Sequence, residues 1–178
     1  MRIVAGKFKS RIINAPMGDN TRPSSDKTRQ AIFNVIAPYV YDANVLDIFS
    51  GSGALAIEAI SRGAKKATMI DNNLEAIKCI NSNISSLKIN DQCVVINGDY
   101  KVIEKLSESF DIILLDPPYK LNVIDEIIKI IEEKELLNEN GIIVFESDEE
   151  HVINYEVNGY VIKNKKYGIA HVTFLYKV

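Results

Sequence analysis

The sequence predicts an α/β fold with a mostly parallel sheet of seven strands, because short apolar runs alternate with amphipathic helical segments. The stretch VLDIFSGSGALAIEAISRG at 45–63 reads as a buried strand, a glycine turn and a helix, the opening unit of a Rossmann-like domain. The last two apolar runs have no helix between them. They predict a C-terminal hairpin that places one antiparallel strand in the sheet.

Each expected element follows from its own pattern of apolar residues. The alternating part of the chain holds five expected strands, VLDIF, KATMID, CVVIN, DIILLD and GIIVFE. Helices are expected between them at 54–62, 73–87, 100–108 and 122–134. The hairpin is expected from 160–166 and 169–178, with a tight turn at Tyr167-Gly168. Before the first strand, Ser25 or Asp26 is expected to cap a helix that runs to about Ala37 and ends at Pro38.

Length and composition limit the class of protein. A chain of 178 residues with 47% hydrophobic content is predicted to form one globular domain. No apolar run approaches a membrane span, and MRIVAGKFKSR is too charged for a signal peptide, so we expect a cytoplasmic protein without a membrane partner. Cys79 and Cys93 lack the paired spacing of a zinc site, so we expect buried free thiols and no metal.

The N-terminal part of the chain is basic. We assign residues 1–25 to an arm with a small hairpin and residues 26–178 to the Rossmann-like domain, in a single domain overall. Residues 1–30 hold seven basic and two acidic side chains, a net of +5 against −8 for the remainder. This asymmetry favours a polyanion partner, although a merely solvated terminus would give the same pattern. The predicted nucleic-acid contacts are Arg2, Lys7, Lys9, Arg11, Arg22, Lys27 and Arg29.

The glycine turn indicates a nucleoside cofactor without identifying it. Gly51, Gly53 and Ala56 satisfy the loose G-x-G-x-x-G/A fingerprint, which nicotinamide enzymes share with other nucleoside-cofactor enzymes. Asp47 places a carboxylate inside an apolar strand, where burial is costly unless hydrogen-bond donors are near. We predict that Asp47, Gly51 and Gly53 form part of a cofactor site. The alternative is a tight turn whose N–H groups simply bond Asp47.

Four successive strands end in or next to an aspartate, namely Asp47, Asp71, Asp99 and Asp116. Because the carboxyl ends of parallel strands share one edge, these carboxylates are expected to line the crevice where open α/β sheets bind ligands. Asp71 lies at the position from which a carboxylate reaches ribose hydroxyls, and Asp99 is placed to accept from an adenine amino group. Asp71 or Asp99 could instead cap the helix that follows it.

The most informative motif is Asp116-Pro117-Pro118-Tyr119, directly after a buried strand. Two prolines lack N–H donors, so they fix the backbone and leave carbonyl groups free to accept hydrogen bonds. A carboxylate, a proline carbonyl and an aromatic ring together form a receptor for a planar group that bears an NH2. A rigid loop that ends the strand is the alternative.

These motifs resemble a known family. Asp116 to Tyr119 looks like the (D/N)PP(Y/F) motif of S-adenosylmethionine-dependent amino methyltransferases, and LDIFSGSGALAIEAISRGA resembles their cofactor motif. RIVAGKFKSR, TRPSSDKTRQAIFNVI and KYGIAHVTFLYKV resemble the RsmD family of bacterial methyltransferases, which act on guanine N2 in 16S ribosomal RNA. The resemblance covers nearly the whole chain. It departs at Ala5, where glycine is usual, and at Ser24, where threonine is usual.

The resemblance implies a class I methyltransferase fold, S-adenosylmethionine as cofactor and specific site residues. The Gly51–Gly53 loop would hold the methionine part, Asp71 the ribose and Asp99 the adenine. Asn72 and Tyr100 are further expected cofactor contacts. Asp116, Pro117, Pro118 and Tyr119 would hold a flipped guanine. The implied partner is 16S ribosomal RNA or the assembling small ribosomal subunit, and we expect the protein to be a monomer.

Three other functions stay open from the sequence. A DNA adenine methyltransferase would share the DPPY motif, and a nicotinamide dehydrogenase would share the glycine turn. A non-catalytic RNA-binding protein on the same fold is the third. Each predicts a different ligand: DNA, a nicotinamide dinucleotide, or RNA without a methyl donor.

Overall fold

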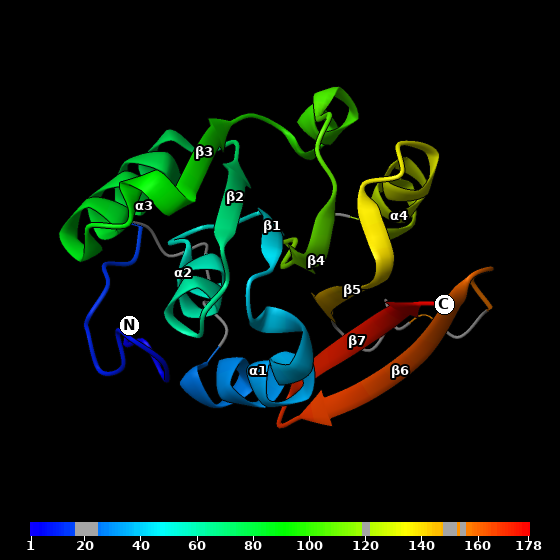
Figure 1. Cartoon of the computed structure of the whole chain (residues 1–178), viewed down its shortest axis with the longest axis horizontal. Coiled ribbons are helices and arrows are strands. Elements are labelled where there is room, and N and C mark those ends of the chain that lie inside the picture. Colours follow the sequence, from blue (N-terminus) through cyan, green and yellow to red (C-terminus); the bar gives the residue numbers. More distant parts are fainter. Residues whose placement is uncertain (17–24, 119–121, 148–152, 154–155) are drawn as a thin grey trace.

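The computed structural model describes residues 1–16, 25–118, 122–147, 153 and 156–178. Within these residues the strands form one seven-stranded sheet with the order β3-β2-β1-β4-β5-β7-β6 (Figure 1). The strands are β1 (Asn44–Ile48), β2 (Lys66–Asp71), β3 (Cys93–Asn97), β4 (Phe110–Leu115), β5 (Leu137–Ser147), β6 (Tyr160–Tyr167) and β7 (Ala170–Lys177). Strands β1 to β5 pair in parallel, and β7 pairs antiparallel with both β5 and β6. The predicted sheet is therefore confirmed.

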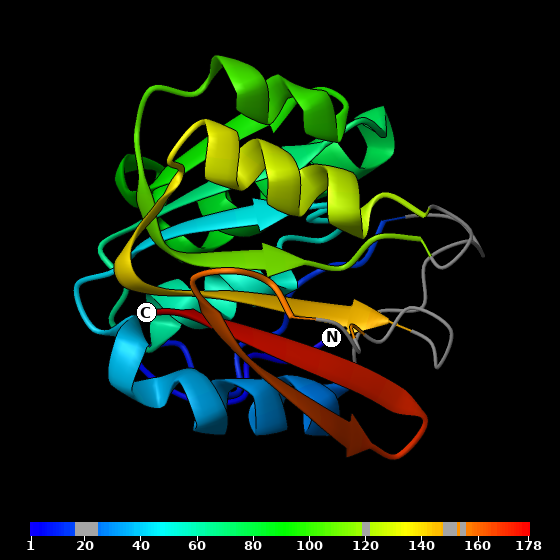
Figure 2. The same cartoon turned by 90° about the vertical axis from the view of Figure 1, so that its right-hand side faces the viewer.

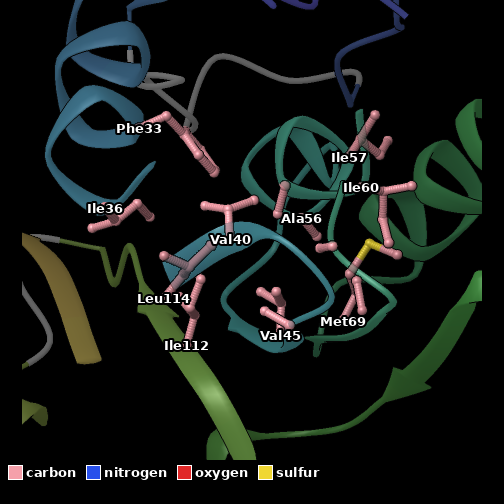
Figure 3. Packing of buried hydrophobic residues seen from close by; sticks show 14 of the residues in the cluster. Phe33, Ile36, Val40, Val45, Ala56, Ile57, Ile60, Met69, Ile112 and Leu114 are labelled. Carbon is pink, nitrogen blue, oxygen red and sulfur yellow. The ribbon is translucent and has the colours of Figure 1, made fainter. Parts of the chain in front are cut away.

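Helices cover both faces of the sheet (Figures 1 and 2). One core cluster joins the sheet to α1 (Asp26–Val40), α2 (Ala54–Ser61) and α3 (Leu74–Leu87). The other cluster joins the opposite face to α4 (Ile124–Glu133) and the 3-10 helix η2 (Tyr100–Lys105). A second 3-10 turn, η1 (Asn90–Gln92), precedes β3. Figure 3 shows Phe33 and Ile36 of α1 packed near Val45, Ile112 and Leu114 of the sheet.

Several predicted boundaries are wrong, including the start of the strand expected at 141, which is Leu137. The expected helix at 100–108 is a short 3-10 helix that ends at Lys105. Pro38 does not end α1, which continues to Val40. A proline this close to the end removes one intrahelical bond, and burial of Val40 in the core favours completing the turn. The hairpin turn is Gly168-Ile169, because Tyr167 still pairs with Ala170 and the positive φ of 64° falls on Gly168.

The N-terminal arm is docked on the domain. An antiparallel bridge joins Arg2 to Ile12, as expected of a small hairpin, and Ile3 is buried in the core. The N–H of Lys7 donates to the carbonyl of Ser61 at 2.7 Å. A Cβ on Gly6 would lie 1.9 Å from that same carbonyl oxygen, so this contact requires glycine. The arm thus packs along α2, while the division of the chain at residue 25 stays a prediction.

The helices of the domain are short compared with a lipid bilayer. Throughout the described ranges, no helix combines the length and the apolar character needed to cross one.

Candidate active site

The carboxyl ends of β1, β2 and β4 bring the predicted acids to one edge of the sheet. Ile48 of β1 is level with Ile70 of β2 and with Leu115 of β4. Asp71 and Asp116 follow these partners, so they occupy the same row on either side of β1. Two strand spacings of about 4.8 Å place their backbones about 10 Å apart. This row lies where the strand order reverses between β1 and β4, the usual ligand crevice of an open α/β sheet.

Asp47 is buried beneath this row, with 1% of its surface exposed. Its Oδ2 accepts a hydrogen bond of 3.2 Å from the N–H of Ala56, near the start of α2. Its Oδ1 is buried without a hydrogen-bond partner. Burial, against the opposing hydrogen bond from the Ala56 N–H and with the added charges of Asp116 and Asp71, raises the pKa of Asp47 to about 8. The N–H of the helix therefore satisfies one oxygen, and the grouped acids favour a cationic ligand.

The glycine loop is held in a fixed shape by β1 and β2. Gly51 and Gly53 both have positive φ, at 56° and 78°. The N–H of Gly51 donates to Oδ2 of Asp71 at 2.8 Å. Ser50 Oγ donates to the carbonyl of Asp47 at 2.7 Å and accepts from the N–H of Ile70 at 3.1 Å. The loop is therefore preorganised, since its turn depends on bonds to two strands.

Asp71 and Asp99 differ in the capping role that the sequence left open. Oδ1 of Asp71 accepts from the N–H of Asn73 at 2.9 Å, but the N-cap of α3 is Asn73. The capping alternative for Asp71 is therefore wrong. Asp99 is the N-cap of η2, and its Oδ1 accepts from the N–H of Lys101 at 3.0 Å. Asn72 is exposed beside Asp71 at the same edge.

Tyr100 packs against Phe49, which precedes the glycine loop. Its ring lies 6.0 Å from the ring of Phe49, centroid to centroid, at a tilt of 41°. Its hydroxyl donates to Oε2 of Glu126 on α4 at 2.7 Å. Because the hydroxyl is engaged with α4, the ring is the part of Tyr100 that can contact a cofactor.

Asp116, Pro117 and Pro118 follow directly after β4. The N–H of Asp116 donates to the carbonyl of Ile48 at 3.5 Å, so the backbone of Asp116 stays beside β1. Pro117 is buried and Pro118 is exposed. Tyr119 lies outside the described residues. The structure thus brings Asp116 to the edge that carries Asp71 and the glycine loop.

Known proteins match the chain over nearly its whole length. The family described as "Conserved hypothetical protein 95" matches residues 1–176. Ribosomal RNA small subunit methyltransferase D of Escherichia coli (strain K12) is 32% identical over 151 residues, which cover 85% of this chain and 76% of the relative. The chain belongs to the RsmD family. The Haemophilus influenzae relative of the same name is 31% identical over 96% of this chain and 90% of its own length.

Solved structures agree with the RsmD family fold. The candidate methyltransferase YhhF of Escherichia coli superposes with a TM-score of 0.89 at 28% identity, covering 99% of this chain and 97% of that one. The candidate methylase HI0767 of Haemophilus influenzae superposes with a TM-score of 0.83 at 27% identity, covering 99% of this chain and 98% of that one. The predicted family and fold class are confirmed.

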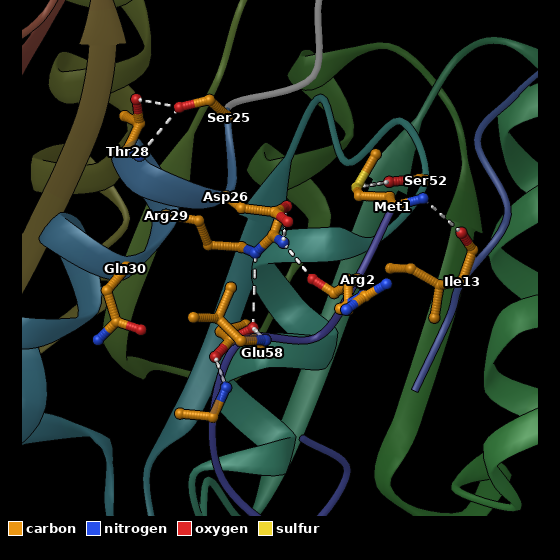
Figure 4. A network of polar contacts seen from close by, with 12 residues as sticks. Met1, Arg2, Ile13, Ser25, Asp26, Thr28, Arg29, Gln30, Ser52 and Glu58 are labelled. Carbon is orange, nitrogen blue, oxygen red and sulfur yellow. Dashed lines mark hydrogen bonds and ion pairs between the residues drawn. The ribbon is translucent and has the colours of Figure 1, made fainter. Parts of the chain in front are cut away.

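One predicted RNA contact of this RsmD family member is wrong. Arg29 is 1% exposed, so it cannot reach RNA phosphates. Its guanidinium binds Oδ1 of Asp26 at 2.8 Å, lies 3.5 Å from Oε2 of Glu58, and donates to the carbonyl of Arg2 (Figure 4). Arg29 therefore fixes the arm to α1 and α2.

The other predicted contacts occupy different parts of the molecule. The exposed ones among the described residues are Arg2, Lys7, Lys9, Arg11 and Lys27, and Arg22 lies outside the described residues. Lys7 and Lys9 lie at the tip of the N-terminal arm, residues 6–10. This arm tip contacts Ser61, the last residue of α2. The eight residues of α2 separate this tip from the glycine loop by about 12 Å at 1.5 Å per residue. The arm tip therefore lies toward the edge opposite the acids.

Glu58 was missed by the sequence reasoning. It is fully buried in α2, where its carboxylate accepts from the N–H groups of Val4 at 2.8 Å and Ala5 at 2.9 Å. Arg62 Nε donates to it at 2.8 Å. An acid within the apolar segment ALAIEAIS was the available signal, because a buried carboxylate needs donors.

Asn83 of α3 was also missed, and it links the arm to the glycine loop. It is 1% exposed. Its Oδ1 accepts from the N–H of Asn14 at 2.8 Å, and its Nδ2 donates to the carbonyls of Asn14 at 3.0 Å and Ser52 at 2.9 Å. A polar residue beside the apolar stripe of α3 was the only signal in the sequence.

Both cysteines of the described part of the chain are free thiols. Cys79 is a buried free thiol, whereas Cys93 is free but half-buried. No group of three or more His, Cys, Asp or Glu in that part could hold a metal ion.

Proposed function

We propose that this protein transfers a methyl group from S-adenosylmethionine to the exocyclic N2 of a guanine in 16S ribosomal RNA. The observation that carries this proposal is the shared row of Asp71 and Asp116 on either side of β1, with Asp71 bonded to the glycine loop. A cofactor acid and an acceptor motif at one edge fit a donor and an acceptor bound side by side. Family members named as ribosomal RNA small subunit methyltransferases support the substrate class.

The site fits a cofactor that carries positive charge. Asp47, Asp71 and Asp116 interact electrostatically, and Oδ1 of Asp47 is buried without a partner. S-adenosylmethionine has a sulfonium and an ammonium group, which such a group of acids attracts. When bound, it supplies a methyl group on positively charged sulfur.

Each part of the cofactor has proposed partners. The Gly51–Gly53 loop and Asp47 hold the methionine part. Asp71 and Asn72 hold the ribose hydroxyls, and Asp99 and Tyr100 hold the adenine. Both oxygens of Asp71 already accept backbone N–H groups, but a carboxylate has further lone pairs for the ribose.

The acceptor amine is activated by position. The N2 lone pair of guanine is delocalised into the ring, which makes the nitrogen a poor nucleophile. Asp116 and the Pro117 carbonyl accept both N–H bonds and favour the pyramidal nitrogen that can attack, while Pro118 fixes the backbone and Tyr119 stacks on the base. Asp116 does not need to be a strong base, because the amine becomes cationic and acidic after attack.

The physical setting completes the proposal. The partner is 16S ribosomal RNA or the assembling small ribosomal subunit, the enzyme acts as a monomer in the cytoplasm, and no metal takes part. Arg2, Lys7, Lys9, Arg11, Arg22 and Lys27 are the proposed phosphate contacts of the N-terminal part, giving salt-dependent affinity.

The decisive experiment offers the protein labelled S-adenosylmethionine with three substrates: small-subunit ribosomal RNA, assembled small subunits and duplex DNA. We expect label in the RNA or the subunit, located at a guanine N2 by nucleoside analysis. Label in DNA adenine would favour the DNA methyltransferase instead. Transfer to none of the three would contradict the proposal.

A further inference from the structure

The C-terminal hairpin carries a second concentration of positive charge. Residues 160–178 contain four lysines and no acidic residue. With a net of +5 for residues 1–30, the middle of the chain, 31–159, has a net of −12. RNA phosphates would be repelled by that acidic middle, so the two basic ends are the places where a phosphate backbone can be held.

Two of these lysines lie at the same edge of the sheet as the acids of the candidate site. Strand β6 is antiparallel to β7, which is antiparallel to β5, so β6 runs in the direction of β1 to β5. Its carboxyl end therefore meets theirs, and Figure 2 shows the arrowheads of β1, β4, β5 and β6 on one side. Lys165 and Lys166 occupy this end.

The register gives their distance from the acceptor motif. Leu115 is level with Phe145, Phe145 with Thr173, and Thr173 with Asn164. Lys165 and Lys166 are the next two residues, so they are level with Asp116 and Pro117. Three strand spacings separate β4 from β6, a distance of about 14 Å. That is the length of about four nucleotides of a stacked strand at about 3.4 Å each.

The side chains of Lys165 and Lys166 are exposed, and they lie on the strand at the edge of the sheet. Successive residues of a strand point to opposite faces, so one lysine lies on each side of β6. No ion pair among the described residues involves Lys165. Lys163, by contrast, lies over the ring of Tyr176 at 4.9 Å, and Lys177 pairs with Glu139 at 2.9 Å.

We infer that the carboxyl end of β6, with Lys165 and Lys166, contacts the phosphates of the RNA strand whose target guanine lies at Asp116. This inference rests on the proposed function and adds a surface far from the arm tip. Lysines on an edge strand also prevent pairing with other chains, and that role alone would explain them without RNA. RNA affinity separates the two roles.

The test measures the affinity of the full chain for small-subunit ribosomal RNA over a range of salt concentrations, together with methyl transfer. The variant is K165A/K166A. Its matched control is K65A/K134A, which removes two exposed lysines just before β2 and β5, at the opposite edge. A third variant, K165R/K166R, keeps both charges.

We expect K165A/K166A to weaken RNA binding about tenfold near 0.1 M salt and to make the slope of log K against log[salt] less negative by about 1.4–1.8. KM for RNA should rise with little change in kcat, and K165R/K166R should bind like wild type. Equal affinity and slope for K165A/K166A and wild type, with methyl transfer intact, would overturn the inference but leave the proposed function standing. Self-association of K165A/K166A with normal RNA affinity would assign the lysines to edge protection alone. Absence of methyl transfer by the wild type would instead defeat the proposed function.

Discussion

The N–H of Gly51 donates a hydrogen bond of 2.8 Å to Oδ2 of Asp71, which joins the glycine loop to the end of the neighbouring strand. The residues proposed to bind the methionine part and the ribose of the cofactor are thus joined by a direct hydrogen bond. A change at Asp71 should affect both.

We therefore expect Asp71→Ala to weaken S-adenosylmethionine binding by at least about tenfold, because a charge-assisted bond contributes about 1.5–3 kcal/mol. Titration calorimetry measures this. The control is Asn73→Ala, which removes the N-cap of α3 and should cost about 1 kcal/mol of stability with cofactor affinity almost unchanged. Equal losses of affinity in both variants would show that the effect comes from α3 and not from the carboxylate.

Asp47 should make cofactor binding depend on pH. A cationic ligand favours the ionised carboxylate, and the pKa of Asp47 is raised to about 8 by burial and by its acidic neighbours. Binding should therefore release a proton, and affinity should increase as pH rises to about 8 and level off above it. Calorimetry in buffers of different ionisation enthalpy measures the proton. Asp47→Asn should abolish the pH dependence, whereas an unaltered dependence would exclude Asp47 as its source.

The same pKa shift predicts how stability changes with pH. The folded pKa is above the unfolded value of 3.8, so between these values the native state binds more protons than the unfolded state. The free energy of unfolding should fall as pH rises from about 4 to 8, and Asp47→Asn should relieve this loss by an amount on the order of 5 kcal/mol at about 1.4 kcal/mol per pKa unit. Urea unfolding at pH 5 and pH 8 tests it. A loss of stability that is the same in both proteins would refute the burial of this charge.

Asn83→Ala should destabilise the fold by about 1–3 kcal/mol, because it removes three hydrogen bonds to the backbone, of which the one to the Ser52 carbonyl is buried. Two of them belong to Asn14 and one to Ser52, so the loop should also loosen and cofactor affinity should drop. The control on the same helix is Asn81→Ala, whose exposed side chain donates to the Ile77 carbonyl. Thermal unfolding of both variants is measured with and without cofactor. Similar stabilities of Asn83→Ala and Asn81→Ala would disprove the linking role of Asn83.

Asp116→Ala should lower kcat for methyl transfer by about 10²-fold or more, because it removes an acceptor that positions the amine. RNA affinity should change little, since phosphate contacts supply most of it. Single-turnover transfer and filter binding separate the two quantities. Unchanged transfer by this variant would refute the assigned role of Asp116.

The local sequence pattern predicted where the site residues lie in the fold better than it predicted which residues contact one another. The acids at Asp71 and Asp116 were correctly placed at one edge, because strand alternation and crossover direction are local properties that fix which ends of parallel strands meet. Arg29 shows the limit of such reasoning. The charge of Arg29 in the basic N-terminal part suggested an RNA contact. In the structure the guanidinium of Arg29 is buried beside Glu58, a residue far away in the sequence.

By itself, the sequence determined the order of helices and strands, the sheet edge that carries the aspartates, and membership of the RsmD family. Those features depend on residue type and spacing along the chain. Only the tertiary structure decided that the arm tip lies at Ser61 and that Lys165 and Lys166 are level with the acceptor motif. These relations arise from the order and register of strands far apart in sequence, which are set by the packing of the whole core.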